Sequence, residues 1–139
     1  MRRFNVSMGT NGSRRRKAAA AVEMALILPV LCSIAAITID YSLLFYHWTT
    51  ISVCAYNGAC YASLNPSATN SAVSTAALVD ATNLTSPSPT VSAPTFSKDA
   101  NNNSFVTVTV SYTYQAHFVW PGMPSTVPLT RSIQIAVTP

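Results

Sequence analysis

One long apolar segment near the N-terminus constrains this chain more than any other feature. From Met24 to Tyr46 the only charged residue is Asp40. As an α-helix, a segment of this length extends roughly 34 Å, and the hydrocarbon core of a bilayer is about 30 Å thick. The hydrophobic region of a secretory signal peptide is shorter, about 7–15 residues. We therefore expect a membrane-spanning helix over residues 24–46.

The distribution of charge predicts which end of that helix lies in the cytoplasm. The chain is 49% hydrophobic and 9% charged, and six of its eight Lys and Arg residues precede residue 18. Cations that flank a membrane helix mark its cytoplasmic side, whereas a nucleic-acid-binding domain carries them on its folded surface. We expect residues 1–18 to be a basic, disordered cytoplasmic leader, the C-terminal part to be extracytoplasmic, and no nucleic acid to be a partner.

The helix is predicted to continue beyond the membrane as a rod. An apolar stripe recurs at spacings of three and four, as on one face of a helix; its members are Trp48, Ile51, Ala55, Ala59 and Ala62. Asn65-Pro66 then favours an end, because the residue before a proline disfavours helical angles. The predicted helix spans 19–64. A kink or local loosening is expected at Pro29, which cannot donate to the carbonyl of Ala25.

Residues 65–139 are predicted to form a small extracytoplasmic α+β domain. Val73, Ala77, Leu78 and Leu84 lie in helical register and indicate a short helix. Strict alternation over 105–114 is the strongest strand signal, and shorter signals cover 91–97 and 129–137. Three strands need a covering helix. We therefore expect a three-stranded antiparallel sheet packed on the long helix.

Two acidic residues carry the functional argument: Glu23 directly before the apolar segment and Asp40 within it. A charged carboxylate at the edge of the bilayer or within it costs on the order of a few kcal/mol unless it is paired. The Glu23 side chain either extends to the membrane–water interface and has no further role, or it pairs with a partner. Asp40 is either a protonated carboxyl near the outer interface or a contact with a partner.

Few residues are suited to catalysis or to ligand chemistry. The chain has only four acidic residues and two isolated histidines, His47 and His117. It shows no glycine-rich phosphate loop, no Ser/His/Asp grouping and no metal-ligand spacing. We expect neither an enzyme nor a cofactor or metal site.

The cysteines leave three alternatives open. Cys32 lies within the apolar segment and is read as a small packing residue. Cys54 and Cys60 would face an oxidising compartment if the C-terminal part is exported, and are candidates for a disulfide. On one straight helix they are separated by about 9 Å of rise, too far for a bridge. Either the helix breaks at Gly58, or they pair between chains, or they are free.

Three segments together resemble a known family. Lys17–Leu31 (KAAAAVEMALILPVL), the pair Asp40-Tyr41 and the segment 58–62 (GACYA) are similar to the TadE and TadF minor pilins of tight-adherence (Tad) pili. Ala19–Glu23 matches the family's stretch after its cleavage point, and Leu28-Pro29 matches its Leu-Pro. Met24 replaces an aromatic residue of the family, Cys60 replaces an arginine, and Ala18 replaces the glycine before the cut.

The resemblance implies a processed, membrane-held pilus subunit with a pilin-like α+β fold. A prepilin peptidase would cut between Ala18 and Ala19, which makes Glu23 the fifth mature residue. The new N-terminal amine of one subunit would pair with Glu23 of a neighbour, and Pro29 and Asp40 would belong to the assembly surface. Other pilin subunits and the inner-membrane pilus platform would be the partners. An uncut chain would remain a permanent component of the machinery.

The expected location is the bacterial cytoplasmic membrane, as a single-pass protein that can be incorporated into a surface pilus. The alternative from the same location is a membrane-anchored extracytoplasmic binding domain with no filament role. That alternative requires no cleavage of the leader and no role for Glu23.

Overall fold

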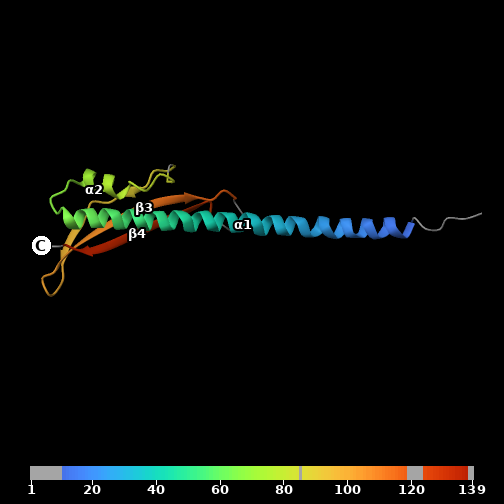
Figure 1. Cartoon of the computed structure of the whole chain (residues 1–139), viewed down its shortest axis with the longest axis horizontal. Coiled ribbons are helices and arrows are strands. Elements are labelled where there is room, and N and C mark those ends of the chain that lie inside the picture. Colours follow the sequence, from blue (N-terminus) through green and yellow to red (C-terminus); the bar gives the residue numbers. More distant parts are fainter. Residues whose placement is uncertain (1–10, 85, 119–123, 138–139) are drawn as a thin grey trace, which may run out of the picture. The chain divides into compact units, whose positions relative to one another are not determined.

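The computed structural model describes residues 11–84, 86–118 and 124–137 (Figure 1). The first ten residues of the predicted leader lie outside these ranges. The chain divides into two compact units, Met1–Ile39 and Asp40–Pro139. We call the second unit the sheet domain.

Helix α1, Asn11–Leu64, contributes to both units. It begins within the segment predicted as leader, because Arg14, Arg15, Arg16 and Lys17 are good helix formers. It continues through Pro29. It ends at Leu64, where the sequence predicts the end, since Asn65 precedes Pro66.

The described part of the N-terminal unit is a helix with an apolar, exposed surface. Its large side chains point outward: Leu26 is 71% exposed and Met24 is 63% exposed. The hydroxyls of Ser33 and Thr38 donate to the carbonyls of Pro29 and Ile34, each at 2.8 Å, so both donors are satisfied inside the helix. Residues Arg16–Leu64 include a window of mean hydropathy 2.3 that is not buried. This helix is compatible with a single-pass membrane anchor.

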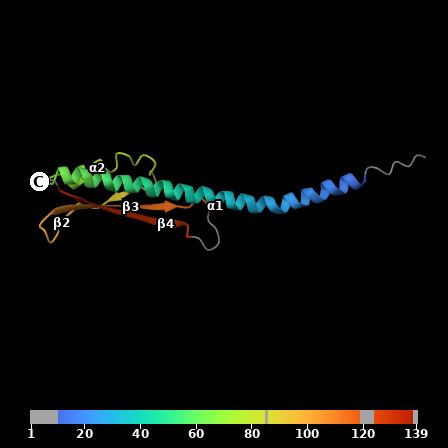
Figure 2. The ribbon, with the colours of Figure 1, turned by 60° about the horizontal axis from the view of Figure 1, so that its bottom comes forward.

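Among the described residues, the sheet domain contains four antiparallel strands, namely β1 (Thr90–Val91), β2 (Thr95–Lys98), β3 (Ser104–Gln115) and β4 (Thr126–Ala136). Figure 2 labels the last three of them. Strand β4 pairs with β3 from Phe105↔Ala136 to Gln115↔Thr126. Strands β1 and β2 pair with β3 as well, so they share its other edge. The α+β fold is therefore confirmed, but the prediction of three strands was wrong.

A proline explains the additional strand. The sequence predicted one strand over 91–97, and the structure divides it into β1 and β2 around Pro94. Proline has no N–H to donate to a strand ladder and tends to interrupt strands. Val91 pairs with Val110, and Thr95 pairs with Thr107, so the two pieces contact different parts of β3.

The alternation of β3 separates a buried face from a polar one, as predicted. The buried face consists of Val106, Val108, Val110, Tyr112 and Tyr114. The opposite face carries hydroxyls, and Thr109 Oγ1 lies 2.7 Å from Ser132 Oγ of β4. Because successive side chains of a strand point to opposite faces, β3 covers the core with one face and exposes polar side chains on the other.

The buried face of β3 packs on the predicted stripe of α1. Ile51, Ala55, Ala59 and Ala62 are fully buried, whereas Trp48 lies at the rim, 36% exposed, with the Arg131 guanidinium 5.8 Å from its ring centroid. The alanines bring the sheet close to the helix axis. Because their own domain covers them, these alanines are unavailable for contacts with another subunit.

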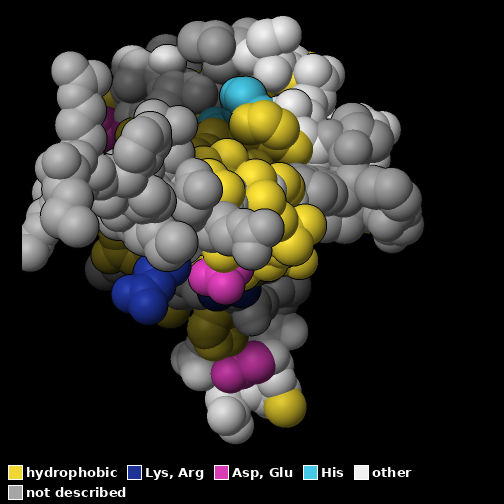
Figure 3. Space-filling model, turned by 90° about the vertical axis from the view of Figure 1, so that its right-hand side faces the viewer, with side chains coloured by type: hydrophobic (Ala, Val, Ile, Leu, Met, Phe, Trp, Pro, Cys, Tyr) yellow, Lys and Arg dark blue, Asp and Glu magenta, His cyan; other side chains and the backbone are white. Residues whose placement is uncertain are grey.

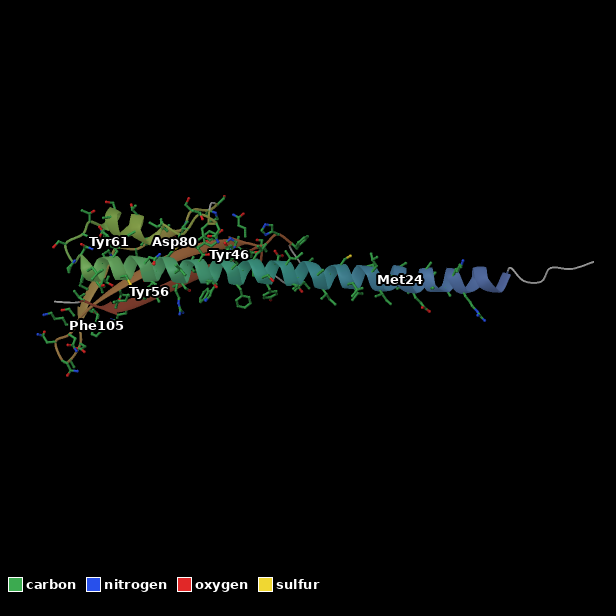
Figure 4. The ribbon with its side chains drawn as sticks, in the orientation of Figure 1. Met24, Tyr46, Tyr56, Tyr61, Asp80 and Phe105 are labelled. Atoms are coloured by element: carbon green, nitrogen blue, oxygen red, sulfur yellow. The ribbon has the colours of Figure 1, made fainter. Side chains whose placement is uncertain are left out.

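The short predicted helix is α2, Asn70–Ala77. The hydroxyl of Thr69 caps it by accepting from the amide of Ala72 at 3.3 Å. Val73 and Ala77 face the core. After α2 comes Asp80, which is labelled in Figure 4. Its carboxylate accepts a hydrogen bond from the side-chain amide of Asn57 of α1 at 2.9 Å. The short helix is therefore joined to α1 by an apolar and a polar contact.

Candidate functional site

Asp40, the first residue of the sheet domain, lies in a buried hydrogen-bonded cluster. Its side chain is 4% exposed. Oδ1 accepts from the amide of His117 at 3.0 Å and from the hydroxyl of Tyr114 at 3.2 Å. Oδ2 accepts from the amide of Phe118 at 3.0 Å. The carboxylate is therefore satisfied by its own domain.

The register of the sheet explains why these donors converge on Asp40. Tyr114 belongs to the buried face of β3, which faces α1. The ladder with β4 ends at Gln115↔Thr126, and one further bond joins the Ala116 amide to the Ser125 carbonyl at 2.9 Å. The next two amides have passed the end of the ladder and need another acceptor. The carboxylate of Asp40 supplies it.

Burial and the nearby carboxylate change the chemistry of Tyr114. Desolvation and then the negative charge of Asp40 raise the pKa of the Tyr114 hydroxyl to about 12. The hydroxyl therefore stays protonated and serves as a donor. The His117 ring also lies near, with Nδ1 3.7 Å from Asp40 Oδ1, but its side chain is 61% exposed. At such exposure an ion pair contributes little.

A small open cavity lies beside this cluster. It has a volume of about 290 Å³, and His47, Asn83, Tyr112 and His117 are among its lining residues. His47 Nδ1 lies 2.8 Å from the carbonyl of Leu43, so this nitrogen carries the hydrogen and Nε2 can accept. The His47 ring stacks on Tyr112 at 5.5 Å between centroids. Among the described residues, no three His, Cys, Asp or Glu side chains gather as metal ligands.

Glu23, in contrast, is an exposed carboxylate on the N-terminal unit. Within the described residues it has no hydrogen-bond or ion-pair partner. Ala18 and Ala19, which flank the predicted cut, are also exposed and lie inside α1. Pro29 lies six residues after Glu23 on the same helix. The two acids predicted from the sequence thus differ: Asp40 binds its own domain, and Glu23 is available to another molecule.

The three cysteines are free thiols in the structure. α1 continues unbroken through Gly58, so Cys54 and Cys60 stay on one helix without a bridge. Cys54 is fully buried, and burial followed by the charge of Asp80 raises the pKa of its thiol. Because the thiolate is the form that exchanges disulfides, Cys54 is poorly suited to that reaction. Cys60 is half-buried and Cys32 is exposed.

The sequence analysis missed the link between Asp40 and the end of β3. The partners are separated by 74 to 78 residues, and no local pattern connects them. Two signals were present separately: an acid at the end of an apolar run, and a tyrosine on the buried phase of a strand. Their combination required the register of β3 on α1.

These features define a class of protein: a long helix with an apolar N-terminal half, whose C-terminal half is covered by a small antiparallel sheet. Residues 18–59 match the family model described as TadE-like protein. The resemblance seen in the sequence is confirmed: the chain is TadE-like over this segment. The match indicates a protein associated with Tad pili. Comparison with curated proteins and with solved structures finds no match.

Proposed function

We propose that this protein is a minor pilin or pseudopilin that takes part in assembling a Tad-type adhesive pilus. The observation that carries the proposal is Glu23, an exposed carboxylate with no partner among the described residues, inside the apolar part of the TadE-like segment. A charge at this place is costly unless a partner neutralises it. Assembly with another subunit supplies such a partner.

The proposed topology places α1 across the cytoplasmic membrane, with the sheet domain outside. The cations that end at Lys17 favour a cytoplasmic N-terminus. Because the sheet domain covers Asp40, the span is proposed to end at Ile39 rather than at Tyr46. The 22 residues from Ala18 to Ile39 extend roughly 33 Å, which suffices to cross the hydrocarbon core.

This shorter span gives the two acids different positions in the bilayer. Glu23 and Asp40 are 17 positions apart, or roughly 26 Å along a helix. The hydrocarbon core is about 30 Å thick, so both cannot lie fully outside it. Asp40 is satisfied by its own domain. Glu23 is therefore the acid that gains most from an external partner.

In this proposal the protein acts by assembly rather than by catalysis. A prepilin peptidase cuts between Ala18 and Ala19, and the new amine of one subunit pairs with Glu23 of its neighbour. Contacts between subunits use the exposed apolar surface of residues 18–39, since Ala55, Ala59 and Ala62 are covered by their own domain. The inner-membrane platform and other pilin subunits are the partners.

The test is the intact mass and N-terminal sequence of the protein recovered from membranes of its host. A mature chain that begins at Ala19 is the expected result. A chain that begins at Met1 would instead indicate a plain anchor or an uncut assembly factor. A cut beyond Ser33 would release the sheet domain and refute the pilin proposal. The variant Ala18→Gly, which restores the residue of the family, is the matched control and should be cut at the same bond.

The second candidate is a membrane-anchored binding domain without a filament role. The cavity of about 290 Å³ beside Tyr112 is the observation that favours it, because a binding domain needs a concave site. That function predicts an uncut chain whose location does not depend on Glu23. The same mass measurement therefore separates the two candidates.

A further inference from the structure

Three exposed aromatic residues lie near Asp40, where the sheet domain begins. Tyr41 and Phe45 lie on α1, within a turn and a half of Asp40, and are 48% and 63% exposed. Phe118 follows β3 and is 45% exposed. We call these three residues the aromatic cluster. In the space-filling view, apolar side chains form the largest coloured area and charged ones are few (Figure 3).

The position of Phe118 is fixed by Asp40. The carboxylate accepts the amides of both His117 and Phe118, at 3.0 Å each, and the Tyr114 hydroxyl at 3.2 Å. These bonds hold the backbone of His117 and Phe118 at the level of Asp40. Asp40 in turn follows Ile39, the last residue of the exposed apolar segment, which is itself 53% exposed.

We propose that the aromatic cluster lies in the interfacial layer of the bilayer, so that the sheet domain contacts the lipid surface through Phe118 as well as being tethered by α1. This inference rests on the proposed membrane anchoring and adds to it the position of the domain. The partner is the lipid headgroup layer on the extracytoplasmic side. Asp40 is the positioning residue, because it sets the level of Phe118 through backbone bonds.

Lipid is favoured as the covering surface by three observations. First, the cluster is continuous in sequence with a segment long enough to cross the hydrocarbon core. Second, aromatic side chains are enriched at membrane interfaces. Third, residues 112–118 contain no Lys, Arg, Asp or Glu, and residues 40–48 contain only Asp40. The Asp40 carboxylate is buried and hydrogen-bonded. No exposed Lys, Arg, Asp or Glu in either segment would have to be desolvated at the lipid surface.

The two ends of β3 differ in the way that this proposal requires. Before β3, a turn built on Asp99 is polar: its carboxylate accepts the amides of Asn101 and Asn103 at 2.9 and 2.8 Å, and Lys98 contacts Asn102. After β3 come Ala116, the exposed His117 and then Phe118. Twelve residues of strand separate the two ends by roughly 40 Å. One end is therefore suited to water and the other to an interface.

The test measures the depth of a nitroxide label at three positions of the full chain in vesicles of phosphatidylethanolamine and phosphatidylglycerol. A Cys54→Ala, Cys60→Ser background leaves Cys32 as the first labelling site, inside the apolar segment. Adding Cys32→Ser with Phe118→Cys or Asn101→Cys provides the other two. Depth is obtained from the collision of each label with oxygen, which enters lipid, and with a water-soluble nickel complex.

The expected result is strong shielding from nickel at position 32, partial shielding with raised oxygen access at position 118, and full nickel access at position 101. If position 32 is shielded but 118 is as open to nickel as 101, the aromatic cluster stands in water and the inference fails. Shielding of 118 from both reagents would indicate a protein partner and would also overturn it. Nickel access at position 32 would refute the membrane anchoring itself.

The variant Asp40→Asn separates positioning from simple proximity. The side chain of the variant has one accepting oxygen and one NH2 group, which only donates. It therefore cannot accept both backbone amides, those of His117 and Phe118. We expect the label at position 118 to lose part of its shielding from nickel, while the label at position 32 keeps its depth. Unchanged shielding at 118 would show that Asp40 does not set the level of this end of the domain.

Discussion

Two buried tyrosines on β3 differ in what their hydroxyls bind. The Tyr114 hydroxyl donates to Asp40, whereas the Tyr112 hydroxyl has no hydrogen-bond partner among the described residues. We predict that Tyr114→Phe lowers the free energy of unfolding by about 1.5–3 kcal/mol, the range for a hydrogen bond to a charged group, and leaves two amides on Asp40. Urea unfolding of the full chain in detergent, followed by tryptophan fluorescence, measures the loss.

The matched control is Tyr112→Phe. It removes the same atom from the same face of the same strand, two residues away, and both side chains are less than a tenth exposed. We expect a change below about 0.5 kcal/mol, because no hydrogen bond within the described residues is broken. Equal losses for the two variants would show that the Asp40 cluster adds nothing to stability.

At the scale of elements, the contact between α1 and α2 depends on one glycine. A Cβ added at Gly58 would lie 2.9 Å from Ala77 Cβ and 3.1 Å from Val108 Cγ1. We predict that Gly58→Ala destabilises the sheet domain by about 1 kcal/mol. The gain in helix propensity, also about 1 kcal/mol, is smaller than an overpacking cost of roughly 1–3 kcal/mol. The same unfolding measurement applies.

The clash assigned to Ala77 is tested by a double-mutant cycle. In an Ala77→Gly background the nearest atom is absent, so Gly58→Ala should cost clearly less than it does in the native chain. If its cost is the same in both backgrounds, the distance between α1 and α2 does not explain the glycine.

The elements also show what the sequence could predict and what it could not. The end of α1, the strand β3 and the buried stripe of α1 follow from local patterns: Pro66, strict alternation, and spacings of three and four. The division of the predicted strand into β1 and β2 arises because Pro94 has no backbone N–H for hydrogen bonding within the sheet. The need for Gly58 and the partners of Asp40 depend on packing between distant segments, which no local pattern contains.

At the scale of the whole molecule, the two units present different surfaces. The sheet domain buries its alanines and satisfies Asp40 internally, whereas the N-terminal unit leaves Glu23 and its apolar side chains exposed. This contrast suggests a division of tasks in which the N-terminal unit makes the contacts of assembly. A substitution at Glu23 should then affect assembly without affecting the fold.

We predict that Glu23→Ala inserts into the membrane normally but is lost from the pilus fraction of host cells. An ion pair that forms in a buried contact and loses one partner costs about 3–5 kcal/mol, so incorporation should fall by well over tenfold. Unfolding of the sheet domain should be unchanged. The control Val22→Ala trims the neighbouring exposed side chain without removing a charge and should be incorporated. Equal incorporation of the two variants would show that Glu23 has no role in assembly and would favour the plain membrane-anchored domain.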